Sequence, residues 1–326
     1  MTINPLDAAF PSSSEPSTGS RASTSSRAST GEATNDTPGT LAGSPEGRRR
    51  SHLSAGLLGV ALPPLSLCLT GLALVSAQKS QLPGVFLFLG ALLLVSGATQ
   101  SWFALRSSVG NLSAGIVALI AQVVVLVTPN GSQDAPFAWA RELIPYGALP
   151  VLAAWFLGSS WAMRQARRAG RKEARMQARL ARADEDRNSV PAAPPSRRSA
   201  HLLSFFVMAA TTWGVLRSLP RPYAHLVDPL TPGPTDVALV SCCLLVLLAA
   251  TVVSAWSSFG MRATAILLAV LALPAVLGEH VPGHRFYVLA LPDLSPVLAV
   301  GLACVLGSLG WGLHLARRQG RSKGSA

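Results

Sequence analysis

Eight apolar runs dominate the sequence, and each approaches the length that a helix needs to cross a lipid bilayer. Lipid offers the backbone no hydrogen-bonding partner, so such runs are expected to be α-helices that satisfy their own amide groups. Charged residues make up only 13% of the chain, which is low for a soluble domain. The sequence therefore predicts an all-α, polytopic membrane protein with eight transmembrane helices. The expected spans are residues 53–77, 82–105, 112–128, 144–163, 201–219, 237–259, 263–277 and 295–315.

A strongly basic segment, residues 164–200, separates the first four apolar runs from the last four. It carries eleven of the 27 arginines and lysines of the chain. Cationic segments resist transfer across a membrane, so this arm and its linker are expected on the cytoplasmic side of the cell membrane. Because each half contains an even number of expected spans, both chain termini are expected on that side too. The Ala-, Gly- and Pro-rich composition, with arginine in place of most lysine, suggests a bacterial inner membrane.

The two membrane halves, residues 48–163 and 201–316, resemble each other in order along the chain. The matched segments are 49–54 with 197–204, 150–153 with 296–299, 157–159 with 306–308, and 166–171 with 316–321. Trp161 and Trp311 precede the last pair of segments at equal spacing. This pattern predicts an internal duplication that gives two parallel four-helix repeats related by an axis along the membrane normal.

The chain ends differ from the apolar runs. Residues 1–47 are rich in Ser, Thr, Pro, Ala and Gly and lack apolar periodicity, so they are predicted to form a disordered cytosolic tail. Residues 317–326 are expected to form a second, short basic tail on the same side. Val75-Ser76-Ala77 resembles a signal-peptide cleavage site, but the preceding apolar run is longer than a signal core, which favours a membrane span.

Six arginines of the basic arm recur every three or four residues and therefore share one face of a helix that continues from the fourth span. This face could act only as a topological anchor, or it could bind anionic lipid headgroups or a partner protein. Nucleic acid is an unlikely partner because no aromatic residues interleave with the cations. The six residues are Arg164, Arg168, Arg171, Arg175, Arg179 and Arg182.

No charged residue falls near the middle of an expected span. Buried ionisable groups are typical of proton relays, so a proton-driven pump with carboxylate couplers is not expected. The polar side chains that could line a pathway for a neutral solute are Gln122, Thr211 and Thr212. The alternative for these three residues is hydrogen bonding between helices.

The sequence offers little catalytic or metal-binding chemistry. We find no Ser–His–Asp arrangement and no phosphate-binding loop. The four cysteines all lie in apolar runs, where cysteine usually behaves as a small hydrophobic residue. His280 and His284, next to Glu279, are a weak candidate for a metal site, because Pro282 and Gly283 place them on a turn. We therefore expect no enzyme activity, no cofactor and no bound metal.

The best interpretation is a non-enzymatic permease- or channel-like component with any pathway between the two repeats. The alternative is a membrane scaffold or assembly factor that docks partners through its tail and basic arm. A polar cavity between the halves, lined by Gln122 or Thr211, would favour the first interpretation. A tightly packed bundle with no cavity would count against it.

Overall fold

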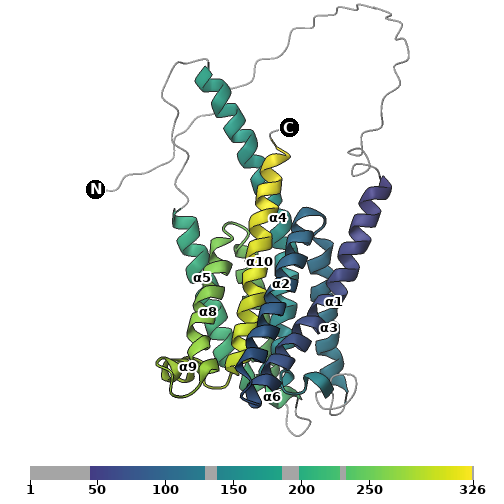
Figure 1. The fold of residues 1–326 in the computed structure, drawn as a ribbon. Coiled ribbons are helices and arrows are strands. Elements are labelled where there is room, and N and C mark those ends of the chain that lie inside the picture. The colour runs from purple at the N-terminus through teal and green to yellow at the C-terminus, as the bar shows by residue number, and fades with distance from the viewer. Residues whose placement is uncertain (1–44, 129–137, 186–197, 228–232, 325–326) are drawn as a thin grey trace, which may run out of the picture. The chain divides into compact units, whose positions relative to one another are not determined.

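The computed structural model describes residues 45–128, 138–185, 198–227 and 233–324, which belong to one compact unit, Ala42–Ala326. Every regular element in these ranges is a helix, as predicted (Figure 1). Residues 1–44 of the predicted tail and residues 186–197 of the linker lie outside the described residues, whereas residues 45–47 of that tail begin α1. The long helices are α1 (Pro45–Gln78), α2 (Leu82–Leu105), α3 (Val109–Val127), α4 (Ala148–Glu185), α5 (Arg198–Ser218), α7 (Pro234–Val253), α8 (Phe259–Leu277) and α10 (Pro296–Ser322), and the short ones are η2 (Ala138–Ala140), η3 (Ile144–Tyr146), α6 (Pro220–Val227) and α9 (His284–Ala290).

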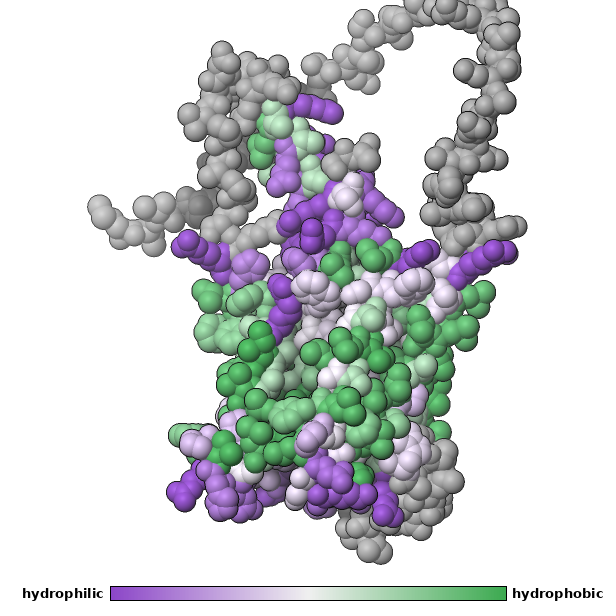
Figure 2. All heavy atoms as spheres, in the orientation of Figure 1, coloured by the Kyte–Doolittle hydropathy of each residue, from purple (hydrophilic) through white to green (hydrophobic). Residues whose placement is uncertain are grey.

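Seven of the described helices, namely α1, α2, α3, α5, α7, α8 and α10, are long and apolar enough to cross a membrane. Their outward faces carry large apolar side chains such as Leu57, Leu94 and Leu245, each at least two-thirds exposed. Figure 2 shows a broad apolar band around the bundle with hydrophilic residues at both ends. An apolar surface of this extent requires lipid around it. The chain is therefore a multi-pass helical membrane protein.

The fourth expected span, residues 144–163, differs from the prediction, so the expected total of eight is not confirmed. Its first residues form η3, which ends at Gly147 with a positive φ of 78°. The rest opens α4, which is not one of the seven candidate spans because Arg164 follows soon after its start. Residues 148–156 of α4 are all buried in the protein. A helix that contacts protein on all sides need not be as apolar as one that faces lipid.

Prolines inside the apolar runs do not end their helices. Pro63 and Pro64 lie within α1, and Pro274 lies within α8. The α8 helix begins at Phe259, four residues before the predicted span, which explains why the run from residue 263 seemed short. A proline inside a membrane helix leaves backbone carbonyls unpaired, and nearby hydroxyl groups can satisfy the chain there. Pro63 and Pro64 leave the carbonyls of Gly59 and Val60 without their usual amide donor. The nearby Ser66 hydroxyl donates to the Leu62 carbonyl at 2.7 Å, a back-bond that serine often makes within a helix.

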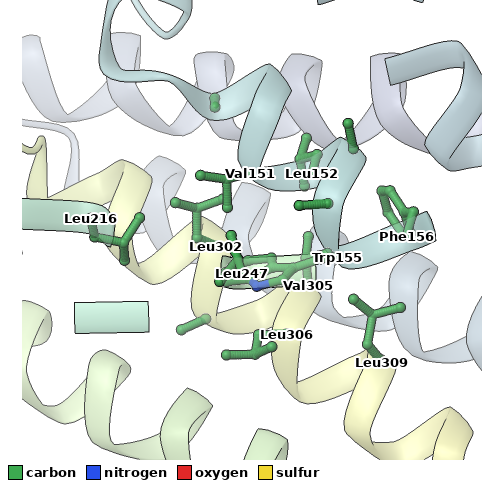
Figure 3. Packing of buried hydrophobic residues seen from close by; sticks show 14 of the residues in the cluster. Val151, Leu152, Trp155, Phe156, Leu216, Leu247, Leu302, Val305, Leu306 and Leu309 are labelled. Atoms are coloured by element: carbon green, nitrogen blue, oxygen red, sulfur yellow. The ribbon is translucent and has the colours of Figure 1, made fainter. Parts of the chain in front are cut away.

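Helices α4 and α10 pack against each other at the centre of the bundle. Trp155 of α4 is fully buried there, beside Leu247 of α7 and Leu302 and Val305 of α10 (Figure 3). These side chains fill the space between the two halves of the chain. The centre is therefore a packed core.

Each half repeats the same arrangement of neighbouring helices. In the first half α1 contacts α2 and α3, and α3 contacts α4; in the second half α5 contacts α7 and α8, and α8 contacts α10. Contacts between halves are also reciprocal, because α4 packs on α7 while α10 packs on α2. Single hydrogen bonds recur as well: His52 Nδ1 lies 2.7 Å from Ser107 Oγ, and His201 Nδ1 lies 2.6 Å from Ser257 Oγ. The two halves therefore share contacts as well as helix order.

The crossing of α4 and α10 requires glycine in both helices. A Cβ atom at Gly170 would lie 2.3 Å from the carbonyl oxygen of Arg317, and one at Gly320 would lie 2.3 Å from that of Arg167. Both distances are too short for non-bonded atoms, and the obstacle in each case is backbone. The two helices can therefore approach this closely only where both carry hydrogen in place of a side chain.

We predict that Gly320→Ala destabilises the folded protein by about 1–3 kcal/mol, because the added methyl group forces α4 and α10 apart. Thermal unfolding of the purified protein in detergent measures the change. Gly90→Ala is the matched control, since a Cβ at Gly90 on α2 meets no atom within 4 Å. Equal stability of the two variants would contradict the close crossing.

Candidate functional site

Cationic side chains gather at one end of the bundle, where α4 and α10 end and where α1 and α5 begin (Figures 1 and 2). All six arginines of the predicted cationic face lie on α4, and all six are exposed. Arg164 also donates from Nε to the Ser108 hydroxyl at 3.2 Å, so it is partly held by the bundle. The spacing argument thus placed the six residues on one exposed helix, while their binding role stays a prediction.

Two further arginines at this end have a structural role that the sequence did not reveal. Arg167 donates from Nη2 to the carbonyl oxygens of Phe103 and Ala104 in the last turn of α2, each at 2.7 Å. Arg317 of α10 donates from Nη1 to the carbonyl oxygen of Trp256, just beyond α7, at 2.7 Å. Each guanidinium satisfies carbonyls that a helix C-terminus leaves unpaired. The only signal in the sequence was that Arg167 and Arg317 occupy matched segments of the two halves.

Burial lowers the pKa of the Arg167 guanidinium, and the neighbouring cations Arg171 and Arg164 lower it further. Its two carbonyl contacts are thus made away from bulk water, where a hydrogen bond from a charged donor is strong. Arg167 therefore ties α4 to the end of α2 and is not available for a ligand.

Glu173 joins α4 to α10. Its Oε1 accepts from Nε of Arg317 at 3.0 Å, and its Oε2 accepts from Nε of Arg321 at 2.9 Å. The Glu173 side chain is only 16% exposed, so this cluster is partly shielded from water. One carboxylate thus holds two guanidinium groups and fixes the direction in which α4 leaves the bundle.

Beyond this cluster α4 stands clear of the other helices (Figure 1). Every side chain from residue 175 to residue 182 is exposed, including the apolar Met176 and Leu180. We call residues 175–182 the projecting segment. A helix of this length is marginal in isolation, so the clamped part of α4 below it supports its helical form.

The three predicted pathway residues do not come together. Gln122 of α3 is buried, and its Oε1 accepts a hydrogen bond from the Tyr223 hydroxyl of α6 at 2.5 Å. Burial raises the pKa of the Tyr223 phenol, which keeps it a neutral donor. Thr212 of α5 is buried and Thr211 is half-buried. Gln122 therefore makes the hydrogen bond between helices that was the alternative to lining a pathway.

A second buried polar pair, which is formed by two amide side chains, was not predicted from the sequence. Gln100 of α2 and Asn111 of α3 donate to each other's carbonyl oxygens, at 2.7 and 3.0 Å. Both residues are fully buried, and each satisfies the other. The sequence did contain a signal, because amides inside apolar runs need partners. It could not show that these two residues face each other across α2 and α3.

Three hollows open at the periphery of the bundle. The first, of about 460 Å³, lies at the base of the arm between α4 and the end of α7. The second, of about 310 Å³, is apolar and lies beside Pro63 and Pro64. The third, of about 580 Å³, lies between α5 and α8 near Arg262. None of these three hollows is lined by Gln122, Thr211 or Thr212.

The weak metal-site candidate gains no support. Among the described residues, no group of three His, Cys, Asp or Glu side chains converges in a way that could hold a metal ion. His284 begins α9 and its Nδ1 is buried without a hydrogen-bond partner, while His280 lies on the preceding turn. Another outer histidine, His225, lies 3.6 Å from the carboxylate of Asp236.

Comparison with known proteins gives no family for this chain. No protein-family model, no curated protein and no solved structure matches it. The function is therefore inferred from the basic end of the bundle, where exposed cations, a clamped helix and a hollow occur together.

We predict that Glu173→Gln destabilises the protein by about 1–3 kcal/mol, because a neutral amide cannot balance two partly buried guanidinium groups. Thermal unfolding in detergent measures the loss, and hydrogen exchange at the end of α10 reports the loosened contact. The control is Glu142→Gln, which removes an exposed pair with Arg141 at 3.5 Å and is expected to change stability by less than about 1 kcal/mol. If the two variants are equally stable, Glu173 does not hold the helices together.

Proposed function

We propose that the chain is an eight-span protein of the cell membrane, built from two parallel four-helix repeats, with both termini in the cytoplasm. The packing of α4 beside α10 at the centre of the bundle supports the eighth span. Reciprocal contacts support the duplication: Arg167 and Arg317, and Gly170 and Gly320, occupy equivalent places and are separated by the same number of residues. The excess of arginine where α4 and α10 end supports a cytoplasmic location for that end.

The helix starts offer further support for the duplication. Ser107-Ser108 precedes α3 and Ser257-Ser258 precedes α8, and a glycine follows two residues later in both places. The Ser107 hydroxyl accepts from the Val109 amide and the Ser257 hydroxyl accepts from the Phe259 amide, each at 3.2 Å. The same local contact at the same position of both halves is what a copied segment would keep.

The function that this geometry favours is a non-enzymatic membrane scaffold that docks a protein with an acidic surface. The projecting segment carries this proposal: Arg175, Arg179 and Arg182 are exposed there together with an apolar pair, Met176 and Leu180, four residues apart. An amphipathic helix of this kind suits an apolar groove with an acidic rim. The Glu173 cluster holds the segment in one direction before a partner arrives, which lowers the cost of ordering it on binding.

The permease- or channel-like interpretation has less support. Gln122 of α3 bonds to Tyr223 of α6, while Thr211 and Thr212 lie on another helix, α5, and Trp155 occupies the centre between the halves. A transport role therefore stays a prediction, and the docking role is the one that follows from an exposed feature.

The proposed topology predicts that a cysteine at Ala178 reacts with a membrane-impermeant maleimide only from the cytoplasmic side. A cysteine at Val281, in the turn before α9, reacts only from the opposite side. Both replacements are made in a variant whose four native cysteines are changed to serine. Labelling of both positions from the same side of sealed vesicles would contradict the topology.

The docking role predicts that a photo-crosslinking amino acid at Met176 gives a discrete adduct in native membranes. The triple variant Arg175→Gln/Arg179→Gln/Arg182→Gln is expected to lose the adduct, because the acidic surface of the partner is no longer matched. The matched control, Arg49→Gln/Arg50→Gln/Arg318→Gln, removes the same charge from exposed positions on other helices and is expected to keep it. The absence of a discrete adduct, or its persistence in the first variant, would reject the docking role.

A further inference from the structure

The hollow at the base of the arm has the composition of a headgroup site. On the α4 side it is lined by Trp161, Gln165, Arg168 and Lys172, and on the α7 side it ends at Trp256. Trp161 and Trp256 are both more than half exposed, as expected of side chains at a membrane boundary. The hollow thus combines two cations and an amide with two aromatic rings at the level where lipid headgroups begin.

The cations in this hollow are available to a ligand. Among the described residues neither Arg168 nor Lys172 has an ion-pair partner, because the nearby carboxylate of Glu173 binds Arg317 and Arg321 of α10. Both cationic side chains are exposed. An anion that enters the hollow therefore does not have to displace a carboxylate from the protein.

At the equivalent place in the other half, a longer side chain reaches across from α10 to α2. In α10 the counterparts of the α4 lining are Trp311, Leu315, Arg318, Gln319 and Ser322. Gln319 lies where α4 has Ala169, and its side-chain amide donates to the carbonyl oxygen of Leu105 at the end of α2 at 2.5 Å. On α4 the short Ala169 side chain leaves that space empty and lines the hollow.

The differences between the two copies all favour an anionic ligand on α4. Trp161 and Arg168 of α4 have identical counterparts on α10. In contrast, α4 has Gln165 where α10 has leucine, and Lys172 where α10 has serine. Lys172 thus adds a positive charge, the single amide stands at Gln165 where α10 has it at Gln319, and Ala169 adds room. The floor of the hollow is apolar and is formed by Val252, Val253 and Ala255 at the end of α7. The rest of α7 is long and apolar enough to cross a membrane.

We propose that this hollow binds an anionic phospholipid. The headgroup phosphate lies between Arg168 and Lys172, the Gln165 amide donates to a phosphodiester or glycerol oxygen, and the acyl chains follow the apolar side of α7. This site goes beyond the docking role and does not rest on it, since the projecting segment lies further along α4. The apolar floor favours a lipid over soluble phosphate, which would use only the polar part of the hollow.

The test compares lipid retention by the full-length protein, measured by native mass spectrometry from detergent micelles that contain phosphatidylglycerol and phosphatidylcholine in equal amounts. The wild-type protein is expected to retain phosphatidylglycerol in preference to phosphatidylcholine. Arg168→Gln/Lys172→Gln is expected to lower this retention about tenfold. The matched control Arg175→Gln/Arg179→Gln removes the same charge from the projecting segment and is expected to retain phosphatidylglycerol as the wild type does.

A second variant separates the site from general charge. Ala169→Gln copies the residue at the equivalent place on α10, keeps every cation, and is expected to lower phosphatidylglycerol retention as strongly as the double variant. Thermal unfolding confirms that each variant is folded. Retention unchanged in Ala169→Gln, or lowered equally in the matched control, would overturn the proposal. Displacement of phosphatidylglycerol by inorganic phosphate would identify soluble phosphate as the ligand and would also overturn it.

Discussion

The close crossing of α4 and α10 is the contact on which the rest of the bundle depends. The contact lies at the basic end of the two helices, between Arg167 and Arg171 of α4 and between Arg317 and Arg321 of α10. Association at this point depends on close packing and on the charged hydrogen bonds beside it. Gly170 and Gly320 allow the two backbones to meet, and each glycine faces a carbonyl group of the other helix. Because α2, α3, α7 and α8 all pack on one or both of these helices, their positions follow from this crossing.

The polar contacts of the bundle fall into two groups with different physical roles. Among the buried side chains, the neutral amides of Gln100 and Asn111 pair with each other, because an unpaired polar group away from water is costly. At the basic end, charged groups satisfy helix ends and join α4 to α10. The exposed cations that remain on α4, from Arg168 onward, take no part in these contacts.

Much of the fold could be predicted from the apolar runs, and the second span, residues 82–105, coincides with α2. The start of the fourth expected span, residues 144–163, could not, because Gly147 with its positive φ separates η3 from α4. Helical spacing found the six exposed arginines and left out Arg167, but it could not show that Arg167 binds the end of α2. The hollow exists because the short side chain of Ala169 leaves space opposite the end of α7. The sequence could not predict this hollow, because residue 169 and the end of α7 are far apart in the chain and no pattern links them.

The central position of α4 also affects how the bundle assembles during synthesis. Its first turns, residues 148–156, are buried mainly by helices that follow in the sequence, above all by α10. During synthesis α4 therefore leaves the ribosome long before the partner that covers it. Until α10 arrives, this segment lacks a helix that packs against it, so completion of the second half stabilises the first.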